Sequence, residues 1–283
     1  GKEKLQKDVI WTVETVDGKI IEEGTFSRRD IDFGLMKIGK ISVELSSCQK
    51  AQKLIFTARV KETLFTNHWE FWVFPEKVEY NESKIYICDS LDNKARKTLE
   101  KGGKVFLNAA GKVVKGAEVK QSFLPVFWNT SWFQMRPPHT LGVTLNPDDP
   151  VFADFPTDYH SNIQWWSILN NTEVMNMEDF PADFKPLIQP IDTWFMNRRL
   201  ATVFEAKVGK GKLMVSSVNL KDSGKDAAAH QLYKSILDYM QSENFDPEWE
   251  VDLDVVADIF KSPSKQQWGK YSENSPDELK PTK

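Results

Sequence analysis

Residues 201–218 read ATVFEAKVGKGKLMVSSV, and this stretch decides the fold of the larger part of the chain. Apolar and β-branched residues dominate 201–208, a glycine-lysine-glycine turn follows at 209–211, and 212–218 is again apolar. Two such runs around a tight turn predict a β-hairpin. The turn lacks the G-x-x-x-x-G-K spacing and joins strand to strand, so it is not a phosphate-binding loop.

Upstream of the hairpin the sequence predicts a β-α-β unit. Residues 84–88 form a short apolar run, and Asp89 and Ser90 are placed to cap a helix over 91–101. Gly102-Gly103 ends that helix, and 104–107 is the next strand. A helical crossover between two strands requires parallel pairing. With further helices near 162–169 and over 227–241, residues 84–245 are expected to be an α/β domain with a mainly parallel sheet.

The N-terminal part is predicted to be all-β. Its expected strands are 9–13, 19–21, 39–45, 53–61 and 67–74, with a hairpin turn at Asp17-Gly18. Short strands without a helical period favour a β-sandwich over residues 8–75. Residues 1–7 are a lead segment, 76–83 a polar linker, and 246–283 a helix over 253–260 followed by a frayed tail. The fold class is therefore α+β multidomain.

Composition excludes several classes of function. The chain has 283 residues, 40% of them hydrophobic, with 18 Phe and 10 Trp, which is ample for real cores. A net charge of −4 argues against nucleic acid as a partner, and no apolar run is long enough to span a membrane. The four histidines, at 68, 139, 160 and 230, lack metal-ligand spacing, so no metal or cofactor is expected.

The two cysteines are expected to be free thiols. Cys48 and Cys88 fall in different predicted domains, which disfavours a disulfide. Cys88 lies between a strand and a helix, where a helix N-terminus could activate a thiolate. The sequence around it lacks the glycines of a nucleophile elbow. A core thiol is favoured, and a Cys88-dependent amidase remains the less favoured alternative.

Aromatic and basic residues gather around the hairpin and mark the candidate site. Such groups suit either a packed interface or a surface that stacks on sugars. Adjacent helical tryptophans at 165 and 166 cannot both face one core, and Asp192 is expected to pair with Arg199 in a buried ion pair. The residues predicted to contact a glycan or another domain are His139, His160, Trp165, Trp166, Asp192, Trp194, Asn197, Arg198 and Arg199.

Several motifs resemble a known family. NHWEFWVFP at 67–75 is similar to the closing strand of an immunoglobulin-like domain in large bacterial glycoside hydrolases of family 2, the β-galactosidase-like group. The α/β domain that follows that strand in the family resembles a class I glutamine amidotransferase, a flavodoxin-like fold. Its landmarks resemble HTLGV at 139–143, FADFPT at 152–157, HSNIQWW at 160–166 and NRRLATVFEAKVGKGKL at 197–213. The resemblance covers about residues 8–245.

The resemblance implies an accessory role without catalysis. The family's catalytic glutamates lie on a (β/α)8 barrel that has no counterpart here, and Asn81-Glu82 matches only a bare dipeptide. The amidotransferase motif G-x-C-x-G is absent as well. The implied partners are the catalytic barrel and sugar-binding domains of a parent chain, a second copy in a homo-oligomer, and a glycan. The implied location is the periplasm or the cell exterior. The rival hypothesis is a free-standing carbohydrate-binding protein with tryptophan stacking platforms.

Overall fold

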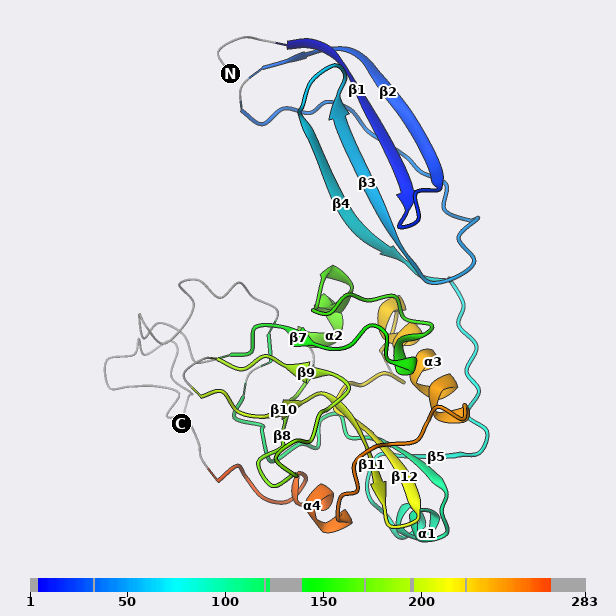
Figure 1. Ribbon diagram of the computed structural model, residues 1–283, viewed down its shortest axis with the longest axis vertical. Helices are drawn as coiled ribbons and strands as arrows, with labels where there is room; N and C mark the ends of the chain where they lie inside the picture. Colours follow the sequence, from blue (N-terminus) through cyan, green and yellow to red (C-terminus); the bar gives the residue numbers. More distant parts are fainter. Residues whose placement is uncertain are drawn as a thin grey trace, which may run out of the picture. The chain divides into compact units, whose positions relative to one another are not determined.

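The computed structural model describes residues 5–265, except 33, 120, 123–138, 171, 194–195 and 222 (Figure 1). The chain divides into two compact units, Gly1–Lys77 and Val78–Lys283. The described residues of the first unit form strands and no helix, and those of the second form both strands and helices. The protein is therefore a mixed α/β chain with more strand than helix elements. Within the described part of the chain, no helix is long and apolar enough to cross a membrane.

The first unit is a four-stranded antiparallel sheet. Its strand order is β2-β1-β3-β4. Trp11, Val13, Cys48 and Leu54 form the buried core of the unit. Gly18, at φ +84°, closes the β1–β2 hairpin in a conformation that favours glycine. The strands are β1 (Leu5–Thr15), β2 (Ile20–Ile31), β3 (Gln52–Val60) and β4 (Thr66–Val73).

The expected strand over 39–45 does not form in this unit. The segment is extended but pairs with no strand among the described residues. Its alternate residues Ile41, Val43 and Leu45 still pack against the core of the sheet. The alternate side chains of residues 41, 43 and 45 thus cover the apolar face of the sheet, although the segment makes no strand-to-strand hydrogen bonds with its described strands. The described residues of this unit form one covered sheet, and the second sheet of a sandwich is not among them.

The second unit is built on a mixed four-stranded sheet with the order β11-β12-β6-β5. The predicted β-α-β unit consists of β5 (Ile85–Cys88), α1 (Asn93–Glu100) and β6 (Lys104–Asn108). Strand β6 pairs in parallel with both β5 and β12 (Gly211–Ser216). The predicted hairpin adds β11 (Val203–Val208) antiparallel to β12. Two of the three pairings in this sheet are therefore parallel.

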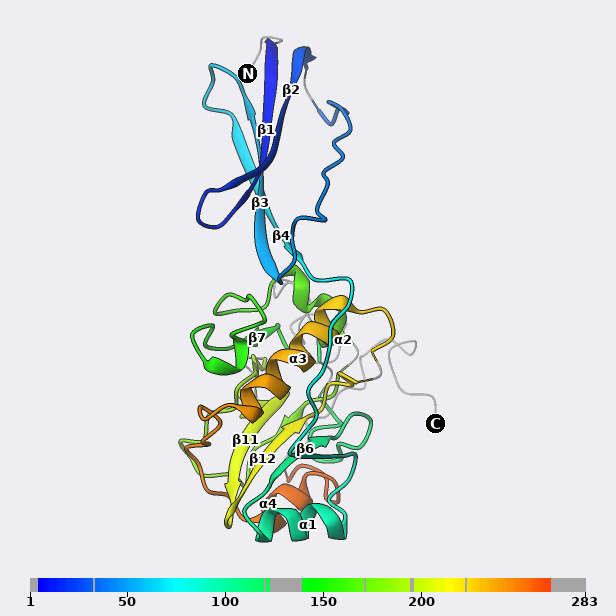
Figure 2. The same ribbon diagram turned by 90° about the vertical axis from the view of Figure 1, so that its right-hand side faces the viewer.

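Helices cover both faces of this sheet (Figure 2). Val105 and Leu107 of β6 join the apolar cluster that contains Leu99 of α1 and Val256 of α4 (Leu253–Asp258). Phe106, between them, points to the opposite face, where its ring lies 5.7 Å from that of Tyr233 in α3 (Ala227–Gln241). The alternation along each strand therefore divides the unit into an α1/α4 side and an α3 side.

Helix α1 begins later than the sequence predicted. Its N-cap is Asp92, whose carboxylate accepts a 2.6 Å hydrogen bond from the backbone N–H of Ala95. Asp89 and Ser90 precede the helix, because the chain first turns away from β5. Helix α3 occupies the predicted range and is capped by Asp226, whereas α4 is shorter than 253–260.

Short elements connect these layers. Strand β7 pairs with β9, and β8 pairs with β10, each in antiparallel orientation. The predicted helix near 162–169 is a 3-10 turn followed by a single short helix. These elements are β7 (Val143–Thr144), η2 (Pro150–Phe152), η3 (Ile163–Trp165), α2 (Trp166–Asn170), β8 (Met175–Asn176), β9 (Gln189–Pro190) and β10 (Leu200–Ala201).

Candidate functional site

Asp192 is the anchor of the loop that precedes β10. Its side chain is only 1% exposed and forms an ion pair with Arg198. The Nε and Nη2 groups of Arg198 donate to the two carboxylate oxygens at 2.9 and 3.0 Å, and the Arg198 backbone N–H donates at 2.8 Å. Asn197, at φ +47°, turns the chain between them. Because the ion pair is bidentate and buried, it fixes the conformation of the loop between residues 192 and 198.

The expected pairing of Asp192 with Arg199 is wrong. Arg199 donates instead to the backbone carbonyls of residues 178 and 180–182. Neighbouring residues in extended backbone point to opposite sides, so only one of the two arginines reaches the aspartate. Arg199 therefore holds a second loop and leaves no free guanidinium for a ligand.

The tryptophan pair behaves as predicted. Trp165 is fully buried beside Phe155, with ring centroids 5.1 Å apart, and its Nε1–H donates to Thr157 Oγ1 at 3.0 Å. Trp166 is 46% exposed. Trp165 is thus a core residue, and Trp166 presents a surface ring. Trp194, the third predicted tryptophan, lies outside the described residues.

The two predicted histidines have different surroundings. His139 is buried, with Nδ1 2.7 Å from the carbonyl oxygen of Thr140 and with no partner for Nε2 among the described residues. His160 is exposed and bridges in antiparallel fashion to Thr144 of β7. The predicted residues therefore do not meet in one pocket. Among the predicted residues that the structure describes, Asp192, Asn197 and Arg198 share a local cluster.

A polar cleft in the second unit is lined by four ionisable side chains of the described residues. Its volume is about 430 Å³. The wall segments come from β7 and the loop after it, from the loop before β9, from β11, and from the chain that follows α3. The residues that line this Glu205 cleft are Thr144, Leu145, Asn146, Asp149, Lys185, Pro186, Leu187, Gln189, Glu205, Glu248 and Trp249.

Glu205 is the most perturbed group of this cleft. It lies on β11 between Phe204 and Ala206, which face the α1/α4 side, so its carboxyl points to the α3 side near Tyr239. Burial raises the pKa of Glu205 to about 7, and the nearby Asp149 carboxyl adds to this, while the Tyr239 hydroxyl opposes it. Burial also raises the pKa of Asp149. The Oε2 atom of Glu205 is buried and has no hydrogen-bond partner among the described residues.

The cleft has the chemistry of a site for a hydroxyl-rich ligand. A carboxyl that is half-protonated near neutral pH can donate or accept a hydrogen bond. Asn146 and Gln189 add amides, and Trp249 adds an indole ring beside Phe184, with centroids 6.3 Å apart. Perturbed carboxyls in a cleft are the usual marks of a functional site.

The sequence analysis missed Glu205. Glu205 lies within the run 201–208 that was predicted to be a strand, and the sequence analysis gave it no role of its own. The cleft that surrounds Glu205 is completed by residues from distant parts of the chain, among them Asn146, Leu187 and Trp249. One sequence signal could have indicated this site: Glu205 is a single carboxylate between apolar residues, on a strand whose other face packs in the core.

Cys88 offers no thiolate nucleophile at neutral pH. Cys48 and Cys88 are both free. Burial first, and then the Asp92 carboxylate, raise the pKa of Cys88 to about 11, so that thiol stays protonated. This weighs against a Cys88-dependent amidase. The described residues contain no group of three histidine, cysteine or acidic side chains arranged to hold a metal ion.

The structure thus defines a mixed α/β unit with a polar cleft, preceded by a small antiparallel unit. The family model described as Domain of unknown function (DUF8487) matches residues 86–261, and the chain belongs to this family. A second model, Domain of unknown function (DUF8488), matches residues 1–75. No curated protein matches the sequence.

Proposed function

We propose that this chain is a non-catalytic accessory region of a glycoside hydrolase, and that the Glu205 cleft holds part of a glycan. The observation that carries the proposal is the cleft itself. It combines two partly buried carboxyls, two amides, a lysine and the Trp249 ring in a volume of about 430 Å³. Proteins bind sugars through such a combination, because hydroxyl groups need donors and acceptors while the sugar face stacks on an aromatic ring.

The fold assignment is part of the same proposal. The second unit would be an amidotransferase-like, flavodoxin-like domain that has lost its nucleophile, and the first a reduced immunoglobulin-like domain. The parallel β5-α1-β6 unit and the helices on both sheet faces support the first assignment. The protonated Cys88 thiol supports the loss of the nucleophile. The antiparallel sheet of the first unit supports the second assignment.

The proposed partners follow from the resemblance to the glycoside hydrolase family. The accessory region would contact the catalytic barrel and the sugar-binding domains of a parent chain, or a second copy, in the periplasm or outside the cell. Trp166, with 46% of its surface exposed, is the predicted residue best placed for such a contact. Exposed aromatic side chains are common anchors of protein interfaces.

Glycan binding can be tested with the full chain on a glycan array, followed by calorimetry. We expect Trp249→Ala to weaken binding at least about tenfold, because aromatic anchors contribute about 2 kcal/mol or more. Trp166→Ala is the matched control and should retain binding. If Trp166→Ala weakens binding and Trp249→Ala does not, the glycan site lies on the surface at Trp166 instead of in the cleft. Absence of binding to every array glycan would overturn the cleft assignment.

One observation favours a second candidate, acid–base hydrolysis in the same cleft. Glu205 has a pKa near 7 and lies close to Asp149, and glycosidases use two carboxyl groups. The test is turnover of nitrophenyl glycosides by the full chain and by Glu205→Gln. We expect no turnover by either. Hydrolysis by the chain that disappears in Glu205→Gln would replace the accessory role with a catalytic one.

A further inference from the structure

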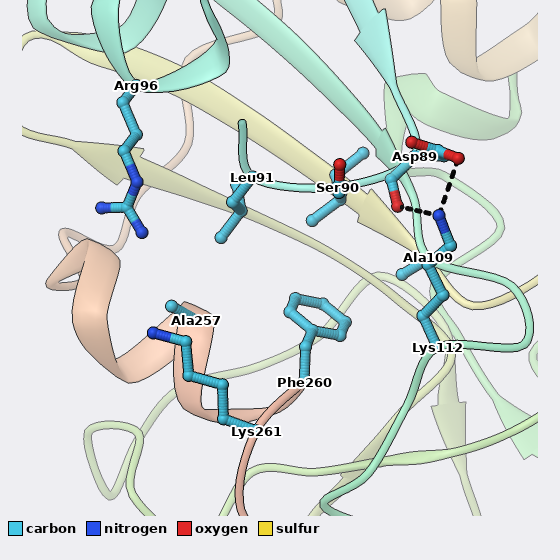
Figure 3. Close-up of a pocket in the computed structure, with 10 residues that line it drawn as sticks. Asp89, Ser90, Leu91, Arg96, Ala109, Lys112, Ala257, Phe260 and Lys261 are labelled. Atoms are coloured by element: carbon cyan, nitrogen blue, oxygen red, sulfur yellow. Dashed lines mark hydrogen bonds and ion pairs between the residues drawn. The ribbon is translucent and has the colours of Figure 1, made fainter. Parts of the chain in front are cut away.

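A second cavity lies at the carboxyl ends of the parallel strands β5 and β6 (Figure 3). Its volume is about 200 Å³. Open α/β sheets bind their ligands at this edge, because the loops that follow the strands surround it. The walls come from the segment after β5, from α1, from β6 and from α4. None of these elements lines the Glu205 cleft, so the two sites are separate.

The floor of this cavity is apolar. Leu107, Ala109 and Ala257 are buried there, and Leu91 and Phe260 are partly buried against the same core. In Figure 3 the Phe260 ring and the Leu91 side chain face each other across the open space. Such a floor favours a ligand with an apolar, ring-shaped body, since stacking and apolar burial act together.

The rim of the cavity is positively charged. Lys112 is neutralised by Asp89, with its Nζ 2.7 Å from the carboxylate and 2.8 Å from the carbonyl oxygen. Arg96 and Lys261 have no carboxylate partner among the described residues, and Figure 3 shows both on the same side of the cavity. The N-terminus of α1 is already capped by Asp92, so an anion would be recognised by these two side chains.

We propose that this cavity binds a small aromatic monocarboxylate. The ring would lie between Leu91 and Phe260, and the carboxylate would pair with Arg96 and Lys261. The size agrees with this class, because an apolar cavity of about 150 Å³ holds a benzene molecule. The whole cavity has a volume of about 200 Å³, which leaves room for a short acid arm beside the ring. The site is independent of the proposed glycan function.

The test is calorimetric titration of the full chain with 3-phenylpropionate. The alcohol 3-phenylpropanol and acetate are the matched probes, because each lacks one half of the recognised chemistry. We expect binding of the aromatic acid alone at millimolar concentration. Arg96→Gln and Lys261→Gln should each weaken it about tenfold, since a hydrogen bond to a charged group contributes about 1.5 kcal/mol or more. Lys97→Gln, on α1 but outside the cavity, should leave the affinity unchanged.

A pocket-blocking variant separates binding from folding. Ser90 lines the mouth of the cavity and is exposed, so Ser90→Phe should abolish binding while the melting temperature is kept. The proposal fails if 3-phenylpropionate does not bind at millimolar concentration. It also fails if the alcohol binds as tightly as the acid, or if the Arg96→Gln/Lys261→Gln double variant keeps full affinity.

Discussion

At the scale of single residues, the buried Asp192 and the partly buried Glu205 show two ways in which a carboxyl is accommodated. Asp192 accepts three hydrogen bonds, two from the Arg198 side chain and one from its backbone N–H. Glu205 has a buried Oε2 without a partner and a pKa raised to about 7. A carboxylate held by several donors stabilises the fold, whereas a carboxyl that lines a cleft with the Tyr239 hydroxyl as its partner is a candidate for contact with a ligand.

Loss of the Asp192 carboxylate should destabilise the second unit strongly. Asp192→Ala removes the bidentate partner of Arg198 and leaves that buried guanidinium only its longer 3.7 Å ion pair with Glu118, which should cost about 3 kcal/mol. The control is Asp238→Ala, which removes one acid from the more exposed pair with Lys234 and should cost under about 1 kcal/mol. Urea unfolding of both variants measures the difference. Equal midpoints for the two variants would contradict a structural role for Asp192.

Glu205 should make the second unit less stable as the pH rises. Its folded pKa is near 7 and its unfolded value near 4.5, so the folded state holds a proton that the unfolded state has lost. The unfolding free energy therefore falls between about pH 4.5 and 7, by on the order of 3 kcal/mol. Tyr239, Asp149, Asp246 and Lys212 surround the carboxyl and set the size of the effect.

Glu205→Gln is the variant that tests this effect. The amide keeps the shape of the side chain and cannot ionise, so the variant should be more stable than the parent chain at pH 8 and similar to it at pH 4.5. Thermal unfolding at both pH values measures this. A parent and a variant with parallel pH profiles would show that Glu205 titrates normally.

At the scale of elements, the β11–β12 hairpin depends on two glycines for different reasons. Gly209 has φ +57° and open space around it, so it serves the backbone conformation of the turn. Gly211 begins β12, and a Cβ there would lie 2.5 Å from the Cα of Leu99. That second glycine allows α1 to pack closely on the sheet.

The two glycines should respond differently to alanine. Gly209→Ala should cost about 1 kcal/mol through the positive φ. Gly211→Ala should cost more, about 1–3 kcal/mol, because the backbone of α1 must move. Each kcal/mol lowers the melting temperature of a domain of this size by about 2–4 °C. A Gly211→Ala variant that melts above Gly209→Ala would show that α1 does not pack closely on β12.

Local patterns in the sequence predicted the hairpin and α3, because their periods repeat over many residues. The start of α1 could not be fixed, since Asp89, Ser90 and Asp92 all have capping side chains and the turn after β5 decides among them. The strand over 39–45 was wrong, because alternation shows which side chains face a core but not whether a backbone neighbour exists. The burial of Glu205 depends on distant loops, which no local pattern reveals.

At the scale of the whole molecule, each unit has its own apolar core. The large cluster of the second unit runs from Ala95 to Ile259, and the small cluster of the first is built around Trp11 and Leu54. None of the residues described in either cluster belongs to the other unit. A core contained within one unit is the main requirement for independent folding.

Residues 78–283 expressed alone should therefore fold cooperatively. We expect a single unfolding transition and the same pH dependence that Glu205 gives in the full chain. Far-ultraviolet circular dichroism during a urea titration, repeated at pH 4.5 and 8, measures both properties. A non-cooperative transition would show that the second unit requires the first.

The two adjacent arginines that engage the Asp192 carboxylate and the carbonyls of residues 178 and 180–182 also form a dibasic sequence, the preferred cleavage site of trypsin-like proteases. Cleavage requires an arginine side chain that can enter the specificity pocket of the protease and a backbone that can become extended. In the native loop both guanidinium groups are held by hydrogen bonds within the protein, so neither can enter that pocket. Trypsin should therefore cut after Arg198 or Arg199 only when this loop opens. The cleavage rate in native buffer therefore measures how often the loop opens. Asp192→Ala should raise this rate by a larger factor than the variant's change in global unfolding free energy would produce.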